Sequence, residues 1–256
     1  MEFLTAFHAD RGLVKERNQD SLCVKVAKTG VGNIAMAVVC DGMGGFSKGE
    51  LASSTVVKSF SEWFDEELPA LIQSEVTPEL IRERWNYLIH NQNNRILEYG
   101  RVNNIKLGTT LVAILIFDNK FVVTVNVGDS RIYKVNNGIY RMTEDQTVVQ
   151  MDLLCGKITR EQAETDPRRH ILLQCVGGSP DLKPVFTCSS ADKDTMYVLC
   201  SDGLSNRIED QELFSYFNPV YNYNEQIMQQ RAIDMVEMSK SRQETDNISV
   251  MLIRTF

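Results

Sequence analysis

Residues 110–142 read TLVAILIFDNKFVVTVNVGDSRIYKVNNGIYRM, and this stretch decides the predicted fold class. Apolar, β-branched and aromatic residues predict four strands in it, over 110–117, 121–127, 131–135 and 139–142. Asp118-Asn119 separates the first two runs and Asn136-Asn137-Gly138 the last two, and both are turn sequences. Because consecutive strands usually pair, we expect an antiparallel meander here.

Further strands are predicted on both sides of this meander. Residues 34–40, IAMAVVC, form a short continuous apolar run, which is typical of a strand buried on both faces. Residues 195–200 and 248–255 are further apolar runs. Helical patterns lie between the strands and do not alternate with them one by one, so the sequence favours an α+β fold with helices packed on antiparallel sheets.

Four helices are expected outside the strands. The first covers roughly 50–68, where apolar residues recur at helical spacing: Val56, Val57, Phe60, Phe64 and Leu68. The second begins with Thr77 as its cap and Pro78 at its first position, and Gly100 is expected to end it. Two more are predicted over 210–217 and 224–240. The large side chains in these helices are interpreted as core, including Trp63, Trp85 and Met235.

Residues 146–180 are mixed and polar, with no long apolar run. Part of this segment is expected to form a mobile surface excursion, and we interpret it as a flap. Within it, Asp166-Pro167-Arg168-Arg169 suits either an exposed loop or the part of a flap that faces a substrate. In the second case its two arginines would suit acidic phosphopeptides.

Composition places the chain among soluble proteins. The 256 residues are 43% hydrophobic and 24% charged, so we expect a single domain, residues 1–256, with a sizeable core. No stretch reaches the roughly 20 apolar residues of a membrane span. Residues 1–8 lack the features of a signal peptide, which predicts an intracellular location. The net charge of −7, without a basic stripe, argues against nucleic-acid binding.

Cysteine and histidine usage argues against zinc and against disulfides. The 6 cysteines contain no Cys-x-x-Cys pair, and several lie inside apolar runs, so reduced core thiols are expected. The 3 histidines, His8, His90 and His170, lie far apart in the sequence and belong to no His-Glu-x-x-His pattern.

The most informative polar residues are five aspartates in glycine-rich or strand-end contexts: Asp20, Asp41, Asp129, Asp202 and Asp246. Three of them follow apolar runs, so a buried strand repeatedly delivers one carboxylate to a turn. If the turns converge, the charge must be cancelled, and a hard divalent cation is the commonest solution with oxygen ligands alone. A single Asp beside Gly is usually only a turn residue, so this interpretation depends on the whole set.

Six short motifs occur in order along the chain: Asp10-Arg11-Gly12-Leu13-Val14-Lys15-Glu16-Arg17-Asn18-Gln19-Asp20, Asp41-Gly42-Met43-Gly44-Gly45, Gly108-Thr109-Thr110, Val127-Gly128-Asp129-Ser130-Arg131, Ser201-Asp202-Gly203-Leu204 and Asp246-Asn247-Ile248-Ser249-Val250. The set resembles the metal-dependent protein phosphatase family, the type 2C Ser/Thr phosphatases, in their bacterial form. The resemblance spans nearly the whole chain. It implies two antiparallel β-sheets packed as a sandwich and flanked by α-helices, in αββα layers, with a binuclear metal centre at one end.

The resemblance also implies a ligand set for two Mn or Mg ions. Asp41 would bridge the ions and Gly42 would offer its backbone carbonyl. Asp202 and Asp246 would hold one ion, and Asp20 would order water around the other. Asp41 and Asp202 would thereby position the metal-bound water, which makes them the catalytic residues.

Three further positions are predicted beside this ligand set. Asp129 would share a third, weaker metal with Asp202, although a surface hairpin position is the alternative for Asp129. Asn247 is expected to support Asp246 or a metal-bound water by hydrogen bonding. Lys15 stands where many members have a phosphate-binding Arg, so it would meet phosphate without the bidentate fork, unless Arg11 or Arg17 substitutes.

The general acid is not assigned by the resemblance. Met43 stands where animal members often carry a His. Protonation of the leaving oxygen would then fall to metal-bound water.

The predicted activity is that of a protein-serine/threonine phosphatase. A water or hydroxide that bridges two ions would attack phosphoserine or phosphothreonine directly, so no protein nucleophile is needed. The partners would be phosphoproteins and, functionally, an opposing Ser/Thr kinase, and the protein would act as a cytoplasmic monomer. Two alternatives stay open: a pseudophosphatase, supported by Lys15 alone, and a metal-dependent phosphodiesterase or nuclease.

Overall fold

The computed structural model describes residues 1–44, 48–118 and 120–256. Gly45 of the Asp41-Gly42-Met43-Gly44-Gly45 motif and Asn119 of the expected turn therefore lie outside the described residues.

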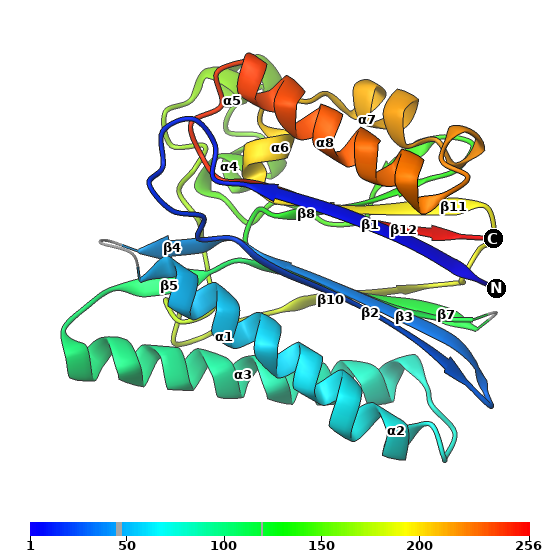
Figure 1. The fold of residues 1–256 in the computed structure, drawn as a ribbon. Helices are drawn as coiled ribbons and strands as arrows, with labels where there is room; N and C mark the ends of the chain where they lie inside the picture. Colours follow the sequence, from blue (N-terminus) through cyan, green and yellow to red (C-terminus); the bar gives the residue numbers. More distant parts are fainter. Residues whose placement is uncertain (45–47, 119) are drawn as a thin grey trace.

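Two antiparallel sheets face one another in the described part of the chain (Figure 1). The first sheet has the order β1 (Phe3–Asp10), β12 (Ile248–Thr255), β11 (Thr195–Cys200), β8 (Arg131–Val135) and β9 (Ile139–Arg141). The second has the order β10 (Val185–Ser189), β7 (Phe121–Val127), β6 (Leu111–Phe117), β3 (Gly32–Cys40) and β2 (Ser21–Thr29). A short pair, β4 (Gly42–Gly44) and β5 (Leu107–Thr109), extends one end.

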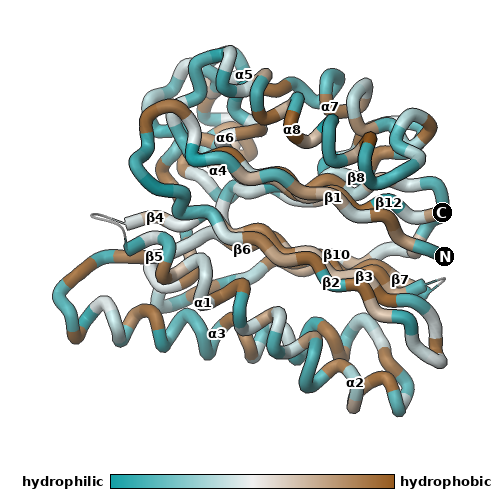
Figure 2. The backbone as a smooth tube through the Cα atoms, in the orientation of Figure 1, coloured by the Kyte–Doolittle hydropathy of each residue, from teal (hydrophilic) through white to brown (hydrophobic). Residues whose placement is uncertain are grey.

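Alternating side chains of the central strands enter two different cores. In β3, Ala35, Ala37 and Val39 pack between the sheets, whereas Ile34 and Met36 face the helices. The strands consequently appear as hydrophobic bands in Figure 2. A strand covered on both faces has no solvent-exposed face, which explains the continuous apolar run over residues 34–40.

Helices cover the outer face of each sheet (Figure 1). The second sheet is covered by α1 (Gly49–Glu62) and α3 (Pro78–Asn103), and the first by α6 (Asp202–Ser205), α7 (Asp210–Phe217) and α8 (Glu225–Ser241). Trp63, Trp85 and Met235 are buried, as predicted. The predicted α+β sandwich with helices outside is confirmed.

The segment 146–180 contains two short helices, α4 (Val148–Leu154) and α5 (Arg160–Thr165). They lie beside α6 at one end of the molecule (Figure 1). Its function as a flap stays a prediction.

The predicted meander is wrong at one junction. β7 pairs with β6 and β10, whereas β8 pairs with β11 and β9, so the chain crosses between the sheets at residues 128–130. Gly128 has φ +101°, and a Cβ there would lie 2.7 Å from Thr110 Cγ2. Only glycine fits this crossing, which carries Asp129 between the two sheets.

Two helix ends also differ from the predictions. α3 starts as predicted, with Thr77 accepting from the Leu80 N–H, but it continues through Gly100 and ends before Asn104, which adopts φ 51°. The close neighbour of Gly100 is Ile105 O, only 2.9 Å from the site of a Cβ. The first helix is longer than predicted, because a π-helical turn (Trp63–Glu67) and α2 (Leu68–Leu71) follow α1.

The sequence analysis missed the short pair β4 and β5 and three strands of the two large sheets: β1, β2 and β10. All three lie at sheet edges, where the side chains are only partly buried. Edge strands carry mixed polar and apolar residues, so they give no continuous apolar run.

All 6 cysteines are free thiols, but the expected core position holds only for Cys40 and Cys200, since Cys155 and Cys188 are exposed. Within residues 1–44, 48–118 and 120–256, no helix combines the length and the apolar character needed to cross a bilayer.

Candidate metal centre

The five predicted aspartates gather at one end of the sandwich. Asp20 stands directly before β2, Asp41 directly after β3, and Asp129 in the crossing after β7. Asp202 starts α6, and Asp246 lies just before β12. Four of them line one cavity of about 540 Å³, and the fifth, Asp20, is buried beside it. Figure 1 places β4, which follows Asp41, at the end opposite both termini.

Burial raises the pKa of the Asp20 carboxyl to about 7, even though the Ser201 hydroxyl donates to Asp20 Oδ2 over 3.0 Å. The negative charges of Asp202 and Asp246 add to this rise. Asp20 is therefore held in an environment that disfavours its ionised form unless a positive charge is supplied.

The neighbouring carboxyls show the same effect. Burial and the charges of Asp20 and Asp202 hold the pKa of Asp41 well above its ordinary value. Burial raises the pKa of Asp129 to about 8, and the charges of Asp202 and Asp145 contribute. Such mutual repulsion is expected where carboxylates are assembled to share a cation.

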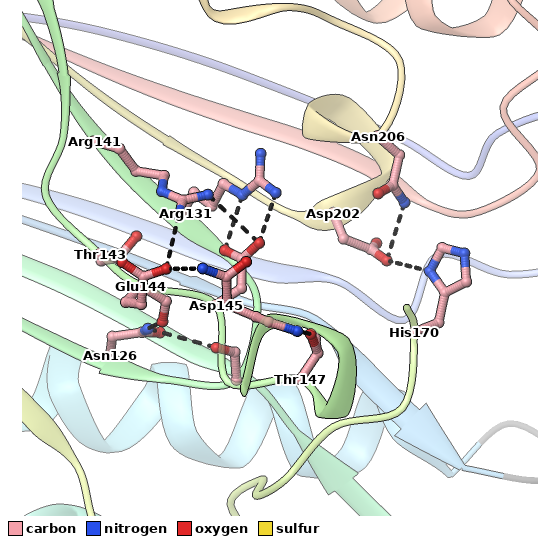
Figure 3. A network of polar contacts seen from close by, with 12 residues as sticks. Asn126, Arg131, Arg141, Thr143, Glu144, Asp145, Thr147, His170, Asp202 and Asn206 are labelled. Atoms are coloured by element: carbon pink, nitrogen blue, oxygen red, sulfur yellow. Dashed lines mark hydrogen bonds and ion pairs between the residues drawn. The ribbon is translucent and has the colours of Figure 1, made fainter. Parts of the chain in front are cut away.

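Asp202 differs because polar side chains face it. Burial acts to raise its pKa, but His170 and Asn206 lower the pKa below its ordinary value. His170 Nδ1 lies 3.8 Å and Asn206 Nδ2 3.3 Å from Asp202 Oδ2, and both point at this carboxylate in Figure 3. Asp202 thus differs from Asp20, Asp41 and Asp129, whose pKa values are raised.

Among the five aspartates of the site, two buried carboxylate oxygens have no hydrogen-bond partner in the described residues, Asp20 Oδ1 and Asp202 Oδ1. Buried carboxylate oxygens are normally paired, and hard oxygen donors suit Mn²⁺ or Mg²⁺. The donor set therefore fits the expected ions.

The side-chain arrangement is not yet that of a closed ligand shell. Within the described ranges, no three Asp, Glu, His or Cys side chains form a group that could hold an ion together. Two of the carboxylates contact cationic or potentially cationic side chains instead. Asp246 Oδ1 lies 2.8 Å from Lys15 Nζ, and Asp202 faces His170.

Glycines allow the loops of the site to approach closely. A Cβ on Gly42 would lie 2.4 Å from Gly49 O and 2.5 Å from Gln19 O. A Cβ on Gly12 would lie 2.1 Å from Asp246 O, and one on Gly203 would lie 2.1 Å from Asn247 O. The glycines of four motifs thus have a steric reason, because any side chain would separate the aspartates.

The Gly108-Thr109-Thr110 motif fixes the backbone of Asp41. The Asp41 N–H donates to Thr110 Oγ1 over 2.9 Å, and Thr109 Oγ1 donates to Asp41 O over 2.8 Å. Thr110 Oγ1 also lies 2.7 Å from Ser130 Oγ, beside Asp129. One threonine therefore connects the turns that carry two of the aspartates.

Asn247 hydrogen-bonds to Asp246 and also holds the 11–19 loop, and its support of a metal ligand stays a prediction. Its side chain accepts from Gln19 N over 2.8 Å and donates to Arg11 O and Arg17 O, so it anchors the 11–19 loop. Its backbone N–H, not its side chain, donates to Asp246 Oδ1 over 2.7 Å.

Lys15 is the cation that this loop brings to the aspartates. Burial acts to lower its pKa, but the hydrogen bond to Asp246 and the charge of Asp41 raise it, so the ammonium stays protonated. Of the two alternatives, Arg17 is directed at Glu50, 3.2 Å away, and only the backbone carbonyl of Arg11 has a contact at the site.

Sequence reasoning missed His170 and Asn206. Arg169 Nε donates to His170 Nε2 over 2.9 Å, which leaves the Nδ1–H for Asp202. Nothing local marks His170, because the fold of residues 146–180 brings it to the site. Asn206 could have been found from the sequence, because it follows Asp202 by four residues at the start of a helix, and residues four apart on a helix are neighbours.

Comparisons with known proteins show the family of this chain. Residues 7–236 match the family described as Protein phosphatase 2C, and the chain belongs to this family. The Serine/threonine phosphatase stp of Listeria welshimeri is 32% identical over 251 residues, which cover 96% of this chain and 94% of the relative. The predicted family and enzyme class, a protein phosphatase, are confirmed.

Solved structures support the fold. The serine/threonine phosphatase Stp1 from Staphylococcus aureus superimposes with a TM-score of 0.86 at 27% identity, covering 100% of this chain and 96% of that one. The catalytic domain of the serine threonine protein phosphatase PstP, in complex with 2 manganese ions, gives a TM-score of 0.77 at 26% identity, covering 98% and 97%.

Proposed function

We propose that this protein hydrolyses phosphoserine and phosphothreonine on proteins at a dinuclear Mn or Mg centre. The observation that carries the proposal is the convergence of five aspartates from remote parts of the chain, with two buried carboxylate oxygens unpaired in the described residues. The related phosphatase structure with two manganese ions supports the same centre.

Asp41, Asp202 and Asp246, with the Gly42 carbonyl, would hold the two ions, and Asp20 would act through water. Asp129 would hold a third, weaker ion together with Asp202. Bound in this way, the ions would activate a water and neutralise the phosphoryl oxygens. The ligands would not select between Mn and Mg, because both ions prefer oxygen ligands. The ion that binds would depend on the concentrations of the two metals.

The chain's own residues would orient the phosphate. Lys15 Nζ lies 2.8 Å from Asp246 Oδ1, and its protonated ammonium could meet a phosphoryl oxygen as a point charge. A Ser/Thr kinase would supply the substrates, because only phosphorylated residues can react. The cytoplasmic location and the monomeric state stay predictions from the sequence.

The test is hydrolysis of p-nitrophenyl phosphate and of a phosphothreonine peptide by the purified chain, with Mn²⁺ and with EDTA. We expect Mn-dependent turnover that Asp41→Asn and Asp202→Asn each reduce at least about 100-fold, with parallel loss of Mn²⁺ binding. Asp65→Asn is the matched control, because Asp65 pairs with Lys25 on the surface.

Three results would count against the proposal. Wild-type turnover in Asp41→Asn would refute the ligand assignment. Phosphopeptide binding without phosphate release would favour the pseudophosphatase. Cleavage of DNA without peptide dephosphorylation would favour a nuclease.

A further inference from the structure

The loop that carries Lys15 is fixed at both ends and unpacked in its middle. Asn247 Nδ2 donates to Arg11 O over 2.9 Å and to Arg17 O over 3.0 Å. Between these anchors, Leu13 and Val14 are 52% and 65% exposed. Because an apolar residue in a rigid loop normally packs against a neighbour, residues 12–16 form an arch with little to hold it in one position.

Within the arch, the Lys15 side chain is placed on a predicted metal ligand. Lys15 Nζ lies 2.8 Å from Asp246 Oδ1, and the two side chains are 41% and 37% exposed. The same Oδ1 accepts the Asn247 N–H over 2.7 Å. Asp246 Oδ1 is therefore satisfied by two donors of this chain, and one of them carries a full positive charge.

Lys15 and a divalent cation would compete for the Asp246 carboxylate. An ion that takes Asp246 brings two positive charges close to the ammonium, and like charges at such distances repel. Lys15 must then turn away, and the unpacked arch allows it to do so while Asn247 keeps the loop ends in place. A phosphoryl group bound at the same site would then offer the ammonium another anion to contact.

From this geometry, and resting on the proposed function, we propose that Lys15 is an exchangeable counter-ion. It holds Asp246 in the metal-free protein, competes with the metal for that carboxylate, and passes to the phosphate once the metal is bound. Metal and phosphate then assist each other's binding, because each favours the arrangement in which Lys15 has left Asp246.

Arg17 provides the matched control. It lies on the same loop and carries the same charge, but its guanidinium contacts Glu50 at 3.2 Å and is 63% exposed. Arg17→Met removes one positive charge from the loop without altering the contact to Asp246. Lys15→Met removes the charge and the contact together, and Lys15→Arg keeps the charge.

The experiment is a Mn²⁺ titration of the full chain, followed by electron paramagnetic resonance of the unbound ion, with and without inorganic phosphate. A half-exposed ion pair is worth at most about 1 kcal/mol, so we expect Lys15→Met to bind Mn²⁺ about two- to fivefold more tightly without phosphate. Phosphate should then increase Mn²⁺ affinity less in Lys15→Met than in the wild type. Arg17→Met should behave like the wild type, and Lys15→Arg should stay near it.

The outcomes separate this proposal from the proposed function. Absence of Mn²⁺ binding to the wild type would overturn both. Mn²⁺ binding that is unchanged or weaker in Lys15→Met, or equally tightened in Arg17→Met, would overturn the counter-ion proposal and leave the proposed function standing. Because Lys15 is half exposed, we expect the variant to fold, and circular dichroism checks this. Should Lys15→Met not fold, Lys15→Gln gives the same comparison.

Discussion

At the scale of single residues, glycines decide whether the aspartates can meet. Gly12 has φ +74° and stands directly against the backbone carbonyl of Asp246. Gly156 has a similar φ of +68° but no atom within 4 Å of an added Cβ. Alanine substitutions at Gly12 and Gly156 therefore separate two effects: the free-energy cost of a left-handed backbone, which both share, and the displacement of the Asp246 backbone, which only Gly12 would cause.

We predict that Gly12→Ala and Gly156→Ala each lose about 1 kcal/mol of stability from backbone strain, and that Gly12→Ala loses more because the loop must move. Only Gly12→Ala should weaken Mn²⁺ binding, since only there does the added methyl displace Asp246. Urea unfolding and Mn²⁺ titration measure the two effects. Equal Mn²⁺ affinity in the two variants would contradict the steric argument.

At the scale of elements, the start of β12 organises the N-terminal loop through Asn247. We predict that Asn247→Ala costs about 1–3 kcal/mol, because it leaves three part-buried backbone groups without this partner. It should also speed amide exchange at Gln19, whose N–H now bonds to Asn247 Oδ1.

Asn224→Ala is the control for this prediction. Asn224 caps α8 by accepting from the Ile227 N–H over 2.8 Å, so its loss should cost about 1 kcal/mol without changing exchange at Gln19. Unchanged exchange at Gln19 in Asn247→Ala would show that other contacts hold the loop.

The segment with α4 and α5 forms one wall of a second cavity of about 680 Å³, which shares Asp129, His170 and Asp202 with the metal site. Polar contacts hold the opposite wall, where Arg131 is directed at Asp145 with its Nη2 2.6 Å away (Figure 3). The two cavities therefore adjoin at Asp129, His170 and Asp202.

The two arginines predicted to face acidic phosphopeptides differ in this structure. Arg168 is paired with Asp166 at 2.7 Å and with Asp152 at 3.2 Å, whereas Arg169 lines both cavities. We predict that Arg169→Gln raises the KM of a phosphopeptide about three- to tenfold and that Arg168→Gln changes it less than twofold. Steady-state kinetics on one peptide give the comparison, and equal effects would refute it.

At the scale of the whole molecule, the carboxylate cluster opposes folding when no metal is present. The pKa values of Asp20 and Asp129 rise from an ordinary value of 3.8 to about 7 and about 8. Between pH 3.8 and about pH 8, the folded state binds more protons at these two carboxyls than the unfolded state does, so the free energy of unfolding decreases as the pH rises. For Asp20 and Asp129 the loss ends above about pH 8, where both carboxyls are deprotonated in the folded and the unfolded state.

We therefore predict that the metal-free chain in EDTA becomes less stable from pH 5 to pH 8 and that Asp20→Asn makes this dependence shallower. Mn²⁺ should stabilise the chain more at pH 8 than at pH 6, because its ligands must lose their protons before they bind. Urea unfolding at each pH measures both. A metal-free stability that rises over this range would contradict the assigned pKa shifts.

Much of the fold was predictable because its signals are local. The central strands are covered on both faces and appear as apolar runs in the sequence. The start of α3 is indicated by Thr77 as its N-cap and Pro78 at its first position. The edge strands and the end of α3 were not predictable in this way. Their character depends on neighbours that only the folded chain supplies.

The sequence by itself determined the sandwich class, the family and the five aspartates, because strand-end Gly-Asp patterns and their order are properties of the chain alone. The tertiary structure decided that β8 joins the other sheet, that Lys15 contacts Asp246, and that His170 reaches Asp202. These contacts join residues far apart in sequence. Their partners are selected by packing and by charge in three dimensions, and no local pattern encodes that selection.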